Sequence, residues 1–163
     1  MPFYSRDSLR NRRPDWVNEN DPLFITICNK QRGTHHFDNP EAWQALLAAA
    51  EHAKNLGRWH PMLFLCMPDH LHVIAKISRT PDITKTLGEL KRDISHRFPT
   101  EWQKGSFDHR LRSYEHYLEK RDYVLLNPVR AELVKSPSDW PYSAWWETKG
   151  YERPGIVRCA FRD

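Results

Sequence analysis

Two apolar segments joined by a two-residue break constrain the fold more than any other feature of this chain. His60–Met67 is almost wholly apolar, Pro68-Asp69 interrupts it, and a second apolar segment then runs from His70 to Ile77. So short a break between two segments of strand length predicts a tight β-hairpin.

Two histidines, His70 and His72, open the second strand of this hairpin. Side chains at i and i+2 leave the same face of a strand, so the two imidazoles are predicted to point together while Leu71 points into the core. Adjacent imidazoles on a rigid strand make half of a metal site. A zinc site that adds Cys66 is an alternative, although Cys66 lies in the preceding strand and no fourth ligand is evident.

Other segments have the patterns of regular secondary structure. Leu23–Cys28 predicts a buried strand, and Ser106–Arg112 predicts a short one. Apolar residues at helical spacing predict helices from Pro40 to about Leu56, from Ile83 to Phe98, and from a Ser113 cap to a stop at Asn127-Pro128. The aromatic segment Asp139–Trp146 is expected to form one helical turn that clamps the C-terminal part of the chain onto the core. Stacking of nucleic-acid bases on its rings is the alternative role.

The order strand, helix, strand, strand, helix, strand, helix resembles the split βαβ pattern of ferredoxin-like and RNA-recognition folds. We therefore predict an α+β fold whose antiparallel sheet has its helices packed mainly on one face. The opposite face is then expected to be free, and the histidine pair to face either a covering helix or a ligand.

Composition fits one domain with a core: the 163 residues are 39% hydrophobic and 12% aromatic. We expect a single domain over residues 1–163, with a basic arm at 1–20 and an aromatic C-terminal extension at 135–163. No apolar run approaches the roughly 20 residues that cross a bilayer, and Met1–Arg13 lacks the apolar segment of a secretory signal. Three widely spaced cysteines without a CxxC pair favour a reducing cytoplasm. The net charge of +4 permits a polyanionic partner without requiring one.

Tyr123 and Asn127 lie four positions apart on the last predicted helix, which places both on one face. If this helix packs beside the histidine strand, the two imidazoles and the Asn127 side-chain carbonyl would hold a divalent cation next to the Tyr123 hydroxyl. A cation neutralises charge on a phosphodiester, and a phenol with a reference pKa of about 10 needs such help to act as a nucleophile. The product would be a covalent phosphotyrosine. Tyr114 and Tyr117 fall outside the i, i+4 pairing with Asn127 and are expected to be packing residues.

These residues also form a recognisable pattern. His70-Leu71-His72, preceded by Met67-Pro68-Asp69 and followed far downstream by Asp122-Tyr123 and Asn127-Pro128-Val129-Arg130, resembles the single-tyrosine HUH transposases. The resemblance is greatest to the REP-associated tyrosine transposases, and it spans roughly Leu23 to Trp146. The combination is specific, whereas the short histidine motif alone would be weak.

The resemblance implies an activity and a set of site residues. The chain would be an enzyme that nicks hairpin-associated single-stranded DNA and rejoins the ends, with His70 and His72 binding Mg²⁺ or Mn²⁺. Tyr123 would become linked to the 5′ phosphate and leave a free 3′ hydroxyl. Asn127 would be the third metal ligand, where related transposases often have Gln. The partner would be DNA with a REP-like hairpin, and the protein would act as a monomer or homodimer in a bacterial cytoplasm, on nucleoid DNA.

Basic residues in two regions are candidate DNA contacts by analogy with that family. They are Arg6, Arg10, Arg12 and Arg13 in the N-terminal arm, and Lys91, Arg92 and Arg97 on the second predicted helix. A frayed terminus and an ordinary solvated helix face are the alternatives for these charges.

Two other functions fit the same residues. The first is a non-catalytic nucleic-acid-binding module, whose affinity would fall steeply with salt and would need no metal. The second is a metal phosphoesterase without a covalent step, which would tolerate loss of the Tyr123 hydroxyl. The absence of a second, distant His-x-Thr motif disfavours a two-histidine phosphoesterase.

Overall fold

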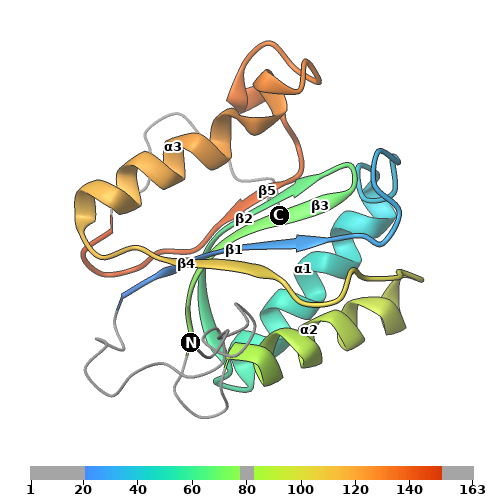
Figure 1. The fold of residues 1–163 in the computed structure, drawn as a ribbon, viewed down its shortest axis with the longest axis horizontal. Helices are drawn as coiled ribbons and strands as arrows, with labels where there is room; N and C mark the ends of the chain where they lie inside the picture. The colour runs from blue at the N-terminus through green and yellow to red at the C-terminus, as the bar shows by residue number, and fades with distance from the viewer. Residues whose placement is uncertain (1–20, 78–82, 152–163) are drawn as a thin grey trace, which may run out of the picture.

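The computed structural model describes residues 21–77 and 83–151 and arranges them around one antiparallel sheet (Figure 1). The strands lie in the order β4-β1-β3-β2-β5. Their bounds are β1 Leu23–Cys28, β2 Trp59–Met67, β3 His70–Ile77, β4 Phe107–Arg110 and β5 Ser143–Trp145. The helices are α1 Pro40–Asn55, α2 Ile83–Arg97 and α3 Tyr114–Arg130. The predicted α+β class with an antiparallel sheet is confirmed.

The predicted hairpin forms the centre of the sheet. β3 pairs with β1 on one side and with β2 on the other, so that His72 lies opposite both Thr26 and Leu65. Leu71 points to the other face, where it is fully buried, as alternation along a strand requires. The histidine strand β3 therefore lies in the middle of the sheet and is hydrogen-bonded along both of its edges.

Two layers of helix cover the two faces of the sheet (Figure 1). α1 and α2 pack together on one face, where Leu46 and Leu90 join Leu71 in the larger core cluster. α3 covers the other face, where Val124 and Leu125 pack with residues of β1, β2 and β3. Most of the helices lie on one face, as predicted, but the expectation of a free second face is wrong. The apolar side of α3 buries that face and brings α3 over the histidine strand.

Local sequence explains where α1 and α3 begin. The Asn39 side chain accepts a hydrogen bond from the Ala42 N–H, and Pro40 fills the first position of α1, where a missing N–H costs nothing. Ser113 caps α3 by accepting from the His116 N–H. Both predicted starts are confirmed.

The predicted end of α3 is wrong, because the helix continues through Pro128 to Arg130. Proline cannot donate the backbone hydrogen bond that the Val124 carbonyl would accept from position 128. The Asn127 side-chain amide donates to that carbonyl at 3.3 Å, and to the Tyr123 carbonyl at 3.0 Å. The amide therefore stands in for the missing N–H, and α3 runs past the proline.

The prediction of one helical turn over the aromatic segment Asp139–Trp146 is also wrong. Pro137–Asp139 forms a short 3-10 turn, η1, and Ser143–Trp145 is the strand β5, paired with Leu63–Leu65 of β2. The expected clamp is present, since Trp140, Trp145 and Trp146 are buried and the Trp140 indole donates to the Cys66 carbonyl at 2.9 Å. The part of the predicted C-terminal extension at residues 152–163 lies outside the described residues, as does the predicted arm at 1–20. None of the helices in the described part of the chain is long and apolar enough to cross a bilayer.

Candidate active site

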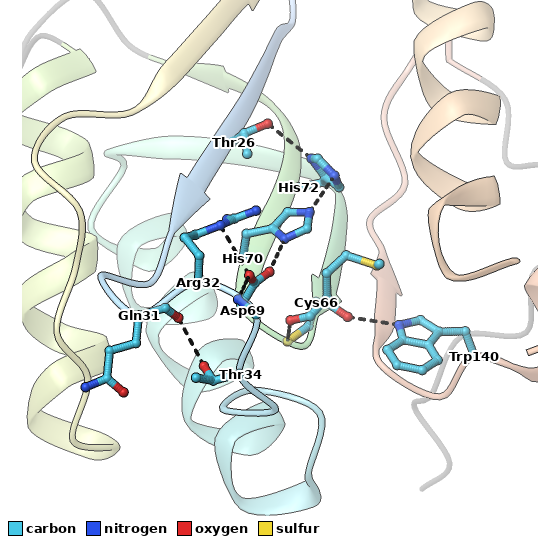
Figure 2. A network of polar contacts seen from close by, with 11 residues as sticks. Thr26, Gln31, Arg32, Thr34, Cys66, Asp69, His70, His72 and Trp140 are labelled. Carbon is cyan, nitrogen blue, oxygen red and sulfur yellow. Dashed lines mark hydrogen bonds and ion pairs between the residues drawn. The ribbon is translucent and has the colours of Figure 1, made fainter. Parts of the chain in front are cut away.

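The two histidines meet on the face of the sheet that α3 covers. His70 and His72 bring their Nε2 atoms to within 3.1 Å of each other (Figure 2). His72 is 5% exposed, and its ring stacks on Phe24 at 5.4 Å between centroids. The two imidazoles therefore lie together as predicted. They belong to β3, which is hydrogen-bonded to a neighbouring strand along each edge.

Each imidazole is held through its Nδ1 atom, the one farther from the meeting point. Asp69 accepts a hydrogen bond from His70 Nδ1 at 2.6 Å, and Thr26 Oγ1 bonds His72 Nδ1 at 3.1 Å. The carboxylate can only accept, so His70 has its proton on Nδ1 and a lone pair on Nε2. If the Thr26 hydroxyl accepts from His72, the second Nε2 is free as well. Carboxylate and hydroxyl partners of this kind are what orient metal-binding histidines.

Asp69 links this network to the loop that follows β1 (Figure 2). Its second carboxylate oxygen accepts from the Gly33 N–H at 2.7 Å and pairs with Arg32 at 3.2 Å. Gly33 has a φ of +74°, a conformation that glycine adopts at no steric cost. Burial alone would raise the pKa of Asp69, but these bonds, the bond from His70 and the nearby positive charges bring it below its ordinary value. Asp69 is therefore a carboxylate at neutral pH.

Electrostatics favour neutral imidazoles. Burial lowers the pKa of His72 to about 3, helped by the positive charges of His70, Lys120 and Arg32. Burial also lowers the pKa of His70, although Asp69 opposes the shift. Both rings are neutral at pH 7, and the neutral imidazole is the form that binds a metal.

α3 brings Tyr123 to this pair within the same chain. The Tyr123 ring lies 6.3 Å from the His72 ring and 6.3 Å from the Phe24 ring, both edge-on. Its side chain stays accessible, with 41% exposure, whereas His72 beneath it is buried. The structure thus places a reachable phenol beside the imidazole pair, as the sequence predicted.

Two cations from α3 flank the Tyr123 ring. The Lys120 ammonium lies 4.9 Å from the Tyr123 centroid and 4.8 Å from the Phe24 centroid. The Arg130 guanidinium carbon lies 5.0 Å from the Tyr123 centroid. Neither cation was identified from the sequence, although positions 120, 123, 127 and 130 repeat at helical spacing on one face of α3.

The side chain of Asn127, the predicted third ligand, forms hydrogen bonds within α3. Its amide nitrogen is used by the carbonyls of Tyr123 and Val124, as described above, so the amide is held along its own helix. Across residues 21–77 and 83–151, no three His, Cys, Asp or Glu side chains gather in a group suited to a metal. A cation on the two histidines therefore needs an oxygen ligand of another type, and the role of Asn127 stays a prediction.

A double-mutant cycle separates the two roles of Asn127. Asn127→Ala should lower the free energy of unfolding by about 1 kcal/mol, because the Val124 carbonyl loses its donor. In the Pro128→Ala background the loss should be smaller, since alanine restores a backbone N–H at position 128. Urea unfolding measures both values, and equal losses in the two backgrounds would contradict the helix-brace role. A metal-ligand role instead predicts that Asn127→Ala weakens Mn²⁺ binding in both backgrounds.

Two sequence-level alternatives can be judged from the geometry. Cys66 packs in the cluster under α1 and α2, on the face opposite the histidines, where its thiol donates to the Phe37 carbonyl. Burial raises the pKa of this thiol well above its usual value. Because Cys66 lies on the other face of the sheet, it does not share a zinc site with His70 and His72. Tyr114 and Tyr117 stack on one another at 5.9 Å and contact Tyr151, which agrees with a packing role.

The predicted DNA-contact residues differ in what surrounds them. The Lys91 ammonium donates to the carbonyls of Gln103 and Gly105, and Arg97 pairs with Asp93, so both have partners within the chain. Arg92 is exposed on the same helix. The N-terminal candidates, Arg6, Arg10, Arg12 and Arg13, lie outside the described residues. All of these contacts stay predictions.

Comparisons with known proteins agree with this geometry. No family model matches the chain. A curated protein of Escherichia coli (strain K12), the REP-associated tyrosine transposase, is 29% identical over 85 residues, which are 50% of this chain and 52% of that protein. The match therefore spans about half the length of the curated relative. A solved structure, described as a REP-associated tyrosine transposase bound to a REP hairpin, superimposes with a TM-score of 0.70 at 22% identity, covering 90% of this chain and 96% of the other. The resemblance predicted from the sequence is confirmed, and the structural match confirms the fold.

Proposed function

We propose that this chain is a metal-dependent single-stranded DNA endonuclease and strand transferase that works through a covalent tyrosine intermediate. One observation supports this most strongly: Tyr123 lies beside the buried, neutral His72, whose Nε2 atom meets that of the half-buried His70 at 3.1 Å. The Tyr123 side chain is 41% exposed, so a DNA strand can reach its hydroxyl from solvent.

The chemistry follows from a phenol near a phosphodiester. The Tyr123 oxygen attacks phosphorus and loses its proton, while the bond from phosphorus to the 3′ oxygen breaks. The leaving oxygen takes up a proton, which yields a free 3′ hydroxyl and a 5′ phosphate ester of Tyr123. Because the ester keeps the energy of the broken bond, a second 3′ hydroxyl reverses the step and joins a new end. A hydrolase, which transfers the phosphate to water, could not rejoin the ends in this way.

The residues present fit a divalent cation. His70 and His72 would hold it through Nε2, with Asp69 and Thr26 fixing the rings from behind, and Asn127 is the proposed oxygen ligand. When bound, Mg²⁺ or Mn²⁺ would neutralise charge on the phosphate. Oxygen ligands suit such a hard ion, and the Asn127 carbonyl would supply one. Cys66, the thiol considered for a zinc site, packs on the other face of the sheet.

The relatives suggest the substrate. Since the structural neighbour is described as bound to a REP hairpin, we propose that this protein acts on single-stranded DNA that contains a comparable hairpin. Tyr123 lies beside His72 within one chain, so we propose that the tyrosine acts with the histidines of its own chain, in a monomer or a homodimer. We place the protein with bacterial DNA in the cytoplasm.

An adduct assay tests the proposal. The protein is incubated with labelled hairpin single-stranded DNA and Mn²⁺, and a labelled band that survives denaturation is sought on a gel. We expect such a band with Mn²⁺ and its loss with EDTA. DNA binding that falls with salt, without an adduct at any metal concentration, would instead favour the non-catalytic binding module.

A further inference from the structure

We propose that Lys120 and Arg130 form an anion clamp around Tyr123, which holds the scissile phosphate at the tyrosine hydroxyl and stabilises the phosphotyrosine that follows. This inference rests on the proposed function and adds to it two residues that would contact the substrate. It comes from the arrangement of charges along α3.

Lys120, Tyr123 and Arg130 lie along one face of α3. Lys120 precedes Tyr123 by three positions and Arg130 follows it by seven, so both side chains share its face of α3. Their charged ends converge on one ring, at 4.9 Å for Lys120 and 5.0 Å for Arg130. Two long, flexible cations on either side of one phenol can reach an anion that lies against its hydroxyl.

The charges of the two residues are not neutralised within the described chain. Among residues 21–77 and 83–151, no carboxylate lies within ion-pair distance of Lys120 or Arg130. Two other arginines near the site are paired: Arg121, next to Lys120, bonds Asp122 at 2.7 Å, and Arg32 pairs with Asp69. Two unpaired cations at one point leave room for an anionic partner, and the phosphate of a DNA strand has that charge.

The present ring contacts are compatible with such a partner. A cation over an aromatic face at an accessible site is held weakly, whereas a charge-assisted hydrogen bond to phosphate is stronger. Lys120 is half-buried and Arg130 is exposed, so Arg130 can move onto a phosphate oxygen at little cost. The rings of Phe24 and Tyr123 keep the Lys120 ammonium close to the reaction centre before DNA arrives.

Single-turnover kinetics test the clamp. The rate of adduct formation is measured at saturating hairpin DNA for Lys120→Gln and Arg130→Gln, with Arg112→Gln as the matched control. Arg112 is an exposed cation just before α3 that has no ring contact with Tyr123. Each clamp variant should slow the step by on the order of 10- to 100-fold, and the control should not.

Conservative variants and stability exclude a merely structural role. Lys120→Arg and Arg130→Lys keep the charge and should recover most of the rate, while thermal unfolding should be unchanged in all variants. Equal rates for both glutamine variants and the control would overturn the clamp, although the adduct itself would still support the proposed function.

A second measurement does not depend on activity. Inorganic phosphate is titrated against a chloride control while the ring resonances of Tyr123 are followed by NMR. Phosphate should shift these resonances in the unsubstituted protein and not in the Lys120→Gln, Arg130→Gln double variant. If the unsubstituted protein forms no adduct, the proposed function fails, and the phosphate titration alone then tests the clamp. A phosphate-induced shift that requires Lys120 and Arg130 supports the clamp, and the absence of any shift overturns it.

Discussion

Tyr123→Phe should abolish the covalent protein–DNA adduct, with a loss of rate on the order of 10⁴-fold or more, because the attacking oxygen is removed. The change should leave stability nearly unaltered. The phenyl ring keeps its contacts with Phe24 and His72, and the lost hydroxyl belongs to a side chain that is 41% exposed. A denaturing gel measures the adduct, and thermal unfolding measures stability.

Tyr114→Phe is the matched control for this result. Tyr114 lies on the same helix and is 40% exposed, but its ring contacts are with Tyr117 and Tyr151. Its variant should form the adduct at the normal rate. An adduct that persists in Tyr123→Phe and disappears in Tyr114→Phe would transfer the nucleophile to Tyr114.

His70→Ala and His72→Ala should each reduce metal-dependent adduct formation by at least about 100-fold, since loss of a partner behind a ligand already costs 10- to 100-fold. Each variant should also weaken Mn²⁺ binding in calorimetry, while binding of hairpin DNA without metal should change little. The two measurements together separate a ligand role from a DNA-contact role.

His36→Ala provides the control for the histidine variants. His36 is a half-buried imidazole with one hydrogen bond, to Thr100, in the loop after β1. Its loss should leave both Mn²⁺ binding and adduct formation intact. Full activity in both His70→Ala and His72→Ala would show that the pair is structural.

The strands beside the site were predictable because their signals are local. Leu23–Cys28 and His70–Ile77 have the bounds that their apolar runs predict, and a two-residue break allows only a hairpin. Alternation then places both histidines on one face without knowledge of the rest of the fold. β5 is different, since three residues cannot show a period and its pairing with β2 links distant parts of the chain.

Residues that act through side-chain direction were harder to predict. Asp69 was interpreted only as part of a turn, yet its carboxylate fixes His70 and pairs with Arg32. An acid directly before a ligand histidine is a usable signal, because ligand imidazoles need such partners. Lys120 and Arg130 had a signal as well, in their spacing from Tyr123, but charged residues on a helix are ordinarily solvated and do not stand out.

At the end of α3, the Asn127 side chain allows the helix to continue past a proline. Proline ordinarily stops a helix at the residue before it. Here the Asn127 amide supplies the donor that Pro128 lacks, so the helix continues to Arg130. The same asparagine was predicted as a metal ligand from its spacing, and only the structure reveals that its nitrogen is already in use.

The central claim is that Tyr123 becomes joined to DNA, and mass spectrometry of the digested adduct tests it most directly. We predict that one peptide, the one that contains Tyr123, gains the mass of a 5′-phosphorylated nucleotide remnant when hairpin DNA and Mn²⁺ are present. Fragmentation should place the added mass on the Tyr123 side chain. Added mass on any other residue, or DNA cleavage without any modified peptide, would contradict the account.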